Sequence, residues 1–89
     1  MRFEWDRKKA QENERKHGVS FDAAISVFYD PLSATFEDVR HSDEEQRFIT
    51  IGYSSRNHLL IVAHTDRKDA VRIISARKAT PVERKRHEE

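Results

Sequence analysis

The last third of the chain carries side chains that could act together on a phosphodiester. His64 ends an apolar run, and Arg67, Arg72, Arg77 and Lys78 follow it closely. Arginine binds phosphate oxygens through paired hydrogen bonds, and histidine or lysine can move protons. RNA supplies its own nucleophile, the 2′-hydroxyl, so a protein needs only to orient it, transfer protons and stabilise the charge on the phosphorus oxygens. These residue types permit RNA cleavage without a metal, provided that the fold brings them together.

The charge distribution also fits a simpler role. Acidic residues dominate between Asp22 and Glu45, whereas basic residues dominate between Arg67 and Arg86. A basic patch favours a polyanion, and the acidic stretch would help to orient it. From the residues alone, a module that binds nucleic acid or an acidic protein without cleavage is favoured over an RNA-cleaving enzyme.

Metal and cofactor chemistry find no support in the sequence. The five histidines show neither His-x-His nor HExxH spacing, and the chain contains no cysteine. Only Gly18 and Gly52 are present, so there is no glycine-rich phosphate loop. We expect no metal and no cofactor.

Length and composition indicate one small domain over residues 1–89. The chain is 36% hydrophobic and 37% charged, with a net charge of +1, so its core must be small. The N-terminus lacks an apolar signal core, and no run approaches the length of a membrane span. We expect a cytoplasmic protein without a membrane segment.

The first third of the chain predicts a short edge strand and two helices. Phe3–Asp6 alternates like a strand, and Asp6 can cap the helix that Gly18 ends. Ser20 can cap a second helix, which Pro31 stops.

From Ser33 the hydrophobic period changes to that of strands. We expect three or four consecutive antiparallel strands, drawn from residues 33–41, 46–55, 58–65 and 70–78, with polar turns between them. Thr80, Pro81 and Glu83 then form the signature of a capped terminal helix. The predicted class is α+β, with the two N-terminal helices packed on one face of a small antiparallel sheet.

Strand alternation makes two further predictions. Ideal alternation along the last strand places Val71, Ile73, Ser75 and Arg77 on one face and Arg72, Ile74, Ala76 and Lys78 on the other. The end of the preceding strand should place His64 where it reaches solvent. A single histidine in a small domain nevertheless more often has a structural role.

Four segments together resemble the BrnT toxins over nearly the whole chain. They are "FEWDRKKAQENERKHGVSFDAAISVFYDP", "RFITIGYSS", "VAHTDR" and "RIISARKATPVERKR". The resemblance implies a RelE-like fold and a bacterial type II toxin that cleaves RNA without a metal and arrests growth. It also implies a BrnA-like antitoxin with a ribbon-helix-helix domain, through which a complex would bind operator DNA and repress its own operon. A homodimer of the toxin within that complex is a further expectation.

The resemblance also implies which residues form the functional site. His64, Arg67, Arg72, Arg77 and Lys78 match its "HT-x-R" and "RIISARK" elements, which implies a catalytic role. The segment that opens at Arg47 and the basic terminal helix imply RNA binding by Arg47, Arg84 and Lys85. Related chains commonly end that helix with a tyrosine, where this chain has His87. His87 could therefore replace the tyrosine as an acid or base.

Overall fold

The computed structural model describes all residues, 1–89, as an α+β fold of five strands, three α-helices and one 3₁₀ turn. In chain order these elements are β1 (Arg2–Glu4), α1 (Arg7–His17), α2 (Phe21–Val27), β2 (Ala34–Glu37), the 3₁₀ turn η1 (Val39–His41), β3 (Arg47–Tyr53), β4 (Leu59–Arg67), β5 (Ala70–Lys78) and α3 (Pro81–Glu88).

Local capping signals set the helix ends as predicted. Asp6 accepts a hydrogen bond from the Lys8 amide at the start of α1, and Gly18 ends that helix with φ 69°, a left-handed conformation that favours glycine. At α3, the Thr80 side chain and the Glu83 side chain each bond the other's backbone in a complete capping box. The predicted bounds of α1 and α3 and the predicted start of α2 at Ser20 are confirmed because these contacts are local in sequence, whereas α2 ends at Val27, before Pro31.

The sheet differs from the predicted antiparallel meander. Its strand order is β1-β5-β4-β3-β2, and β1 pairs in parallel with β5, so the sheet is mixed and has five strands. The expected meander of consecutive antiparallel strands is present as β2–β5, and the sheet adds to it the parallel strand β1, which the expectation of an all-antiparallel sheet of three or four strands missed. The β1–β5 pair joins the two ends of the chain, so no local turn signal announces its direction.

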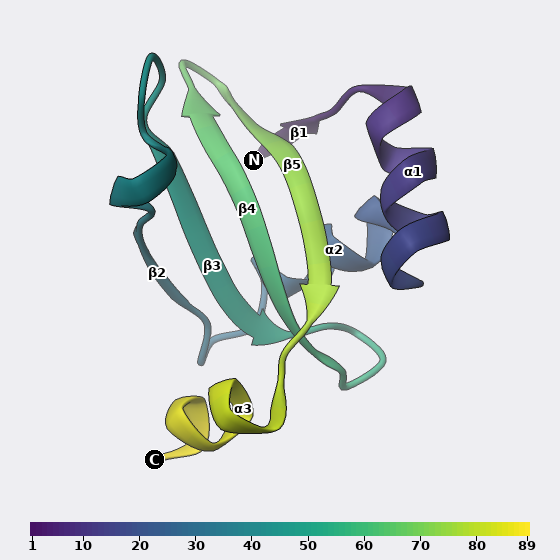
Figure 1. The fold of residues 1–89 in the computed structure, drawn as a ribbon, viewed down its shortest axis with the longest axis vertical. Coiled ribbons are helices and arrows are strands. Elements are labelled where there is room, and N and C mark those ends of the chain that lie inside the picture. The colour runs from purple at the N-terminus through teal and green to yellow at the C-terminus, as the bar shows by residue number, and fades with distance from the viewer.

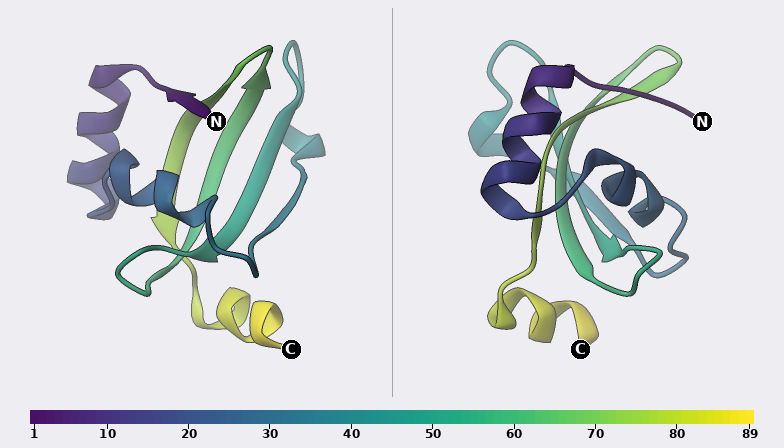
Figure 2. Two further views of the ribbon diagram at one scale, coloured as in Figure 1. Left: turned by 180° about the vertical axis from the view of Figure 1, so that it is seen from behind. Right: turned by 90° about the vertical axis from the view of Figure 1, so that its right-hand side faces the viewer.

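Helix α2 covers one face of this sheet, whereas α1 flanks its β5 edge, so the expectation that both helices pack on one face was wrong for α1. Figures 1 and 2 show α2 across one face of the strands and α1 beside β5, while α3 extends beyond the end of β5. Phe21, Ala24 and Val27 of α2 are buried against sheet residues that include Val62 and Ile73. The opposite surface, here called the open face, is not covered by α1 or α2.

His64 lies inside the covered face. Its side chain is only 2% exposed, and its ring packs edge-on against Phe28 and stacks on Phe48. The imidazole bonds the hydroxyl of Thr50 at 2.7 Å and the carboxylate of Asp66 at 3.0 Å. The expectation that His64 reaches solvent was wrong because β4 continues to Arg67, which leaves His64 within the strand.

A β-bulge at Ile74 changes which side chains of β5 share a face. Ala63 pairs with Ser75 and His64 pairs with Ile73, so Ile74 is an extra residue on β5. Ile73 and Ala76 are therefore both buried in the core although three positions separate them. The predicted alternation was wrong beyond this point: Arg72 and Arg77 both lie on the open face, and Lys78 lies on the covered side.

Asn13 of α1 holds the strand just beyond the bulge. Its side-chain amide donates to the carbonyls of Ala76 at 2.8 Å and Val19 at 2.9 Å, and its oxygen accepts from the Ala76 amide at 3.0 Å. β1 pairs only as far as Arg72, so this stretch of β5 has no neighbouring strand on that side. Asn13 supplies the hydrogen bonds that such a strand would have made.

The buried His64 predicts a pH-dependent stability. Burial lowers the pKa of His64 more than its bond to Asp66 raises it, so the unfolded chain takes up this proton more readily than the folded one. The free energy of unfolding should fall as the pH drops from 7 through the ordinary histidine range, with a slope of at most about 1.4 kcal/mol per pH unit for one proton. Urea unfolding of wild type and His64→Gln at pH 7 and pH 5 measures this.

The variant should lose less stability between the two pH values than the wild type does. His58→Gln provides the control, because His58 is exposed and its replacement should leave the pH dependence unchanged. An equal loss in wild type and His64→Gln would contradict the assignment.

Candidate active site

Three neighbouring strands place Arg47, Thr65 and Arg72 in one row on the open face. Arg47 of β3 pairs with Thr65 of β4, which in turn pairs with Arg72 of β5. Directly opposed residues have Cβ atoms about 5 Å apart, so both guanidinium groups can reach a point above Thr65. Arg67 follows Thr65 by two positions on the same face and can approach that point from a third side. We call these four residues the arginine row.

Two carboxylates pair with members of the row and leave Arg47 without an ion pair. Arg72 Nη1 lies 3.1 Å from Glu4 Oε2, and Arg67 Nη1 lies 3.8 Å from the same oxygen. Arg67 Nε also lies 3.2 Å from Glu45, whereas Arg47 makes no ion pair. Partly exposed pairs of this kind contribute about 0–1 kcal/mol each. A phosphate, which can take paired hydrogen bonds from each arginine, can therefore displace the carboxylates at little cost.

The threonine at the centre of the row has an unpartnered hydroxyl. Thr65 is 4% exposed, and its Oγ1 is buried without any hydrogen-bond partner in the protein. Leaving a buried polar group unpaired costs about 1–3 kcal/mol, and most buried hydroxyls avoid it. This places a spare hydrogen-bonding group among the arginines.

A hollow of about 420 Å³ opens over the row. Its lining mixes the cations of the sheet with residues of α1 and of the β2–β3 connection. The members are Lys9, His41, Asp43, Glu44, Glu45, Arg47, Thr65, Arg67, Arg72 and Ile74.

Ser42 ties the rim of this hollow to the row. Its hydroxyl donates to the Asp38 carbonyl at 2.8 Å and accepts from the Arg47 amide at 2.9 Å. The Asp38 carboxylate in turn lies 2.9 Å from Nδ1 of His41. These short-range bonds fold η1 over the start of β3 and bring His41 to the hollow.

Sequence reasoning missed His41 and Thr65. The spacing Asp38-x-x-His41 was an available signal, since it puts a carboxylate beside an imidazole in one turn. No local pattern could show that the hydroxyl of Thr65 would be unpartnered.

Arg77 lies further along β5 and is engaged by α3. Its Nη1 and Nη2 each lie 2.8 Å from a carboxylate oxygen of Glu83. This pairing, aided by the bond from the Thr80 amide, lowers the pKa of Glu83 to about 2, and it raises the pKa of Arg77. Arg77 lies roughly 15 Å along the strand from Arg72, so one phosphate cannot contact both.

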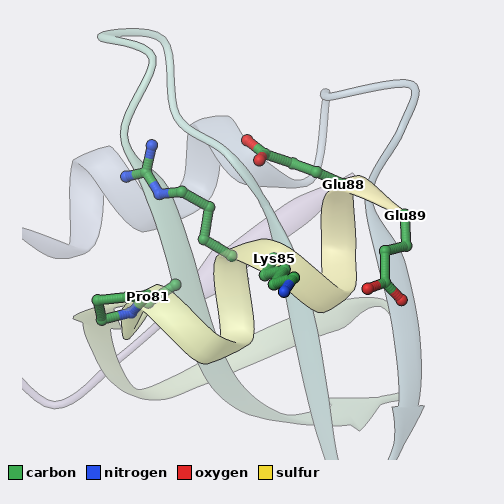
Figure 3. Close-up of a pocket in the computed structure, with 6 residues that line it drawn as sticks. Pro81, Lys85, Glu88 and Glu89 are labelled. Carbon is green, nitrogen blue, oxygen red and sulfur yellow. The ribbon is translucent and has the colours of Figure 1, made fainter.

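The basic residues of α3 are exposed at the far end of the sheet. Arg84 and Lys85 line a hollow of about 440 Å³ together with Pro81, Glu88 and Glu89. Figure 3 shows Pro81, Lys85, Glu88 and Glu89 arranged along the helix, so the cations alternate with carboxylates there. Both hollows therefore mix cations with carboxylates.

His87 contacts a tyrosine from the sheet. Its ring centroid lies 5.9 Å from that of Tyr53, whose hydroxyl donates to Glu88 at 2.6 Å and whose pKa is raised mainly by that bond. Lys78 lies on the covered side, beside the corner between α1 and α2. The structure thus brings Arg47, Arg67 and Arg72 together and leaves the other predicted site residues elsewhere.

Two structural tests bear on cofactors and membranes. No group of three or more histidine, aspartate or glutamate side chains is arranged to hold a metal ion. None of the helices has both the length and the apolar character that a membrane crossing requires.

Three arginines gathered on one face of a small α+β domain are the kind of cluster that suits phosphate binding. Comparison with known families then identifies the group. Residues 5–83 match the family described as the ribonuclease toxin BrnT of a type II toxin–antitoxin system, and the chain belongs to that family.

A solved structure supports the fold. The crystal structure of the ribonuclease toxin BrnT from Brucella abortus superposes with a TM-score of 0.65 at 24% sequence identity, covering 90% of this chain and 97% of the other. At this identity the likeness shows a shared fold. A search among curated proteins finds no match.

The unpartnered hydroxyl predicts an unusual stability effect. Thr65→Val keeps the side-chain shape and removes the buried polar atom, so the free energy of unfolding should rise by about 1 kcal/mol. Chemical denaturation of the purified variant measures it.

Thr50→Val is the matched control. Thr50 is equally buried, but its hydroxyl bonds His64 and Thr35, so this variant should lose stability. Destabilisation of Thr65→Val by a similar amount would show that the Thr65 hydroxyl is satisfied.

Proposed function

We propose that this BrnT-family protein cleaves RNA directly at the arginine row, without a metal ion. The observation that carries the proposal is the row itself: Arg47, Arg67 and Arg72 surround the unpartnered hydroxyl of Thr65. The scissile phosphate would replace Glu4 and Glu45 as the partner of these guanidinium groups.

The arrangement matches the demands of the reaction. When the 2′-oxygen attacks phosphorus, negative charge builds on the two non-bridging oxygens, and fixed cationic donors stabilise it. Three guanidinium groups supply enough hydrogen-bond donors for both oxygens, so the charge can be balanced without a metal ion. The hollow of about 420 Å³ admits a nucleotide segment rather than a buried small molecule.

We further propose that the wider fold is RelE-like and that the protein works in the cytoplasm as a growth-arresting toxin. Its neutralising partner would be a BrnA-like ribbon-helix-helix antitoxin, and the complex, with a toxin homodimer inside it, would repress its own operon through operator DNA. The membership of the family described as one half of a type II toxin–antitoxin system supports these proposals.

The remaining cations receive different roles. Arg77 would hold α3 through Glu83, while Arg84 and Lys85 would bind flanking phosphates of a longer RNA. His64 and Lys78 are on the covered side, and we assign them no contact with RNA. His87 lies beside Tyr53, away from the row, and we assign it no proton transfer.

Paired substitutions separate the row from the end of β5. Arg72→Ala should lower the rate of RNA cleavage about 10²–10³-fold, because it removes a donor to the developing charge. Arg77→Ala should retain cleavage within a few-fold, although α3 loosens. The measurement is the rate of cleavage of a labelled RNA in excess EDTA, with circular dichroism to verify folding.

Arg56→Ala is the control for loss of a positive charge, since Arg56 is exposed in the β3–β4 turn. A large loss in Arg77→Ala with full activity in Arg72→Ala would overturn the site assignment. Salt-sensitive RNA binding without cleavage products would identify a binding module instead, and cleavage that EDTA abolishes would contradict metal independence.

A further inference from the structure

His41 is the only imidazole that lines the hollow over the arginine row. It lines the hollow together with all four members of the row. Arginine keeps its proton at every accessible pH, and ordinary carboxylic acids have already released theirs near neutrality. Histidine is the residue type whose titration range lies near neutrality.

The surroundings of His41 fix which of its nitrogens is available. Nδ1 lies 2.9 Å from Asp38 Oδ2, so that nitrogen donates to the carboxylate. The His41 side chain is 61% exposed and the Asp38 side chain is 17% exposed. The surrounding protein therefore holds the carboxylate in place, and the ring stays open to the hollow. Nε2 makes no hydrogen bond to the protein and is the nitrogen that can meet a ligand in the hollow.

Hydrogen bonds tie the turn that carries His41 to the backbone of Arg47, a member of the arginine row. The Asp38 amide donates to the Arg47 carbonyl at 2.8 Å, and Ser42 links the Asp38 carbonyl to the Arg47 amide. The position of the imidazole is therefore coupled to the backbone of a row arginine rather than to a free loop. Supporting hydrogen bonds of this kind hold a proton-transfer side chain in position against its substrate.

We infer that His41 is a catalytic residue of the RNA cleavage proposed above, acting as the general acid at the leaving 5′-oxygen. In this step the 2′-oxygen forms a bond to phosphorus while the bond from phosphorus to the 5′-oxygen breaks. The proton on Nε2 passes to the 5′-oxygen, and the proton of the 2′-hydroxyl passes to a carboxylate of the hollow or to water. The products are a 2′,3′-cyclic phosphate and a 5′-hydroxyl.

Charged groups from several elements share the hollow with His41 or bond to it. The cations are Lys9 of α1, Arg47 of β3, Arg67 of β4 and Arg72 of β5. The carboxylates are Asp38 before η1 and Asp43, Glu44 and Glu45 in the loop after it. Variants should therefore be compared at several pH values rather than at one.

The inference can be tested with a leaving group that needs no proton. The substrate is a short oligoribonucleotide that the wild type cleaves, prepared with oxygen or with sulfur in the 5′ bridging position of the mapped cleavage site. A thiolate leaves without prior protonation far more readily than an alkoxide does. On the oxygen substrate, His41→Gln should lose about 10²–10⁴-fold in rate.

On the sulfur substrate, the same variant should cleave within a few-fold of the wild type. Asp38→Asn, a change to a positioning residue, should show a smaller loss that sulfur also rescues. His17→Gln, on the exposed side of α1, should behave as wild type on both substrates.

Two outcomes overturn the assignment of His41: full activity of His41→Gln on the oxygen substrate, or an equal loss on both substrates. The second would mean that the imidazole acts before the leaving group departs, as a base or a binding group. Either result leaves the proposed function intact if Arg72→Ala is inactive. If no RNA is found that the wild type cleaves, the proposed function itself fails.

Discussion

The bulge at Ile74 determines what the open face can do. It inserts one residue into β5 opposite β4, and Asn13 of α1 then bonds both backbone groups of Ala76. The shift keeps Ile73 and Ala76 in one core although ideal alternation would separate them. The same shift turns Arg77 outward, toward Glu83 and α3, while Arg72 stays in the row with Arg47 and Thr65. One inserted residue thus lets a strand serve both the core and two separate surface contacts.

The two faces of the sheet differ in how completely their polar groups are paired. On the covered face, the buried polar groups have hydrogen-bond partners: His64 bonds Thr50 and Asp66. At the edge of the sheet, Asn13 bonds the part of β5 that has no neighbouring strand. On the open face, the Thr65 hydroxyl is buried and unpartnered, and arginines are held only by partly exposed carboxylates. Groups left unsatisfied in the free protein can make stronger contacts with a phosphate, as expected where function outweighs stability.

Much of the fold followed from local signals, and the rest depended on contacts distant in sequence. Asp6, Gly18, Ser20 and the Thr80–Glu83 capping box marked the helices because capping is local. The parallel β1–β5 pair and the bulge arise from pairing between remote segments, so periodicity could not show them. The residue types of the site, Arg67 and Arg72, were predicted from their chemistry. Their true neighbours, Thr65 and His41, required the strand register and the η1 turn.

The most direct test of this account is the position of a phosphate on the protein. A crystal structure with a non-cleavable oligonucleotide, in which the 2′-hydroxyl at the cleavage site is replaced by hydrogen, would locate it. The account predicts a phosphate over Thr65, within hydrogen-bond distance of the guanidinium groups of Arg47 and Arg72, with Glu4 displaced. A scissile phosphate bound instead at α3, against Arg77 and Arg84, with the arginine row unchanged, would contradict it.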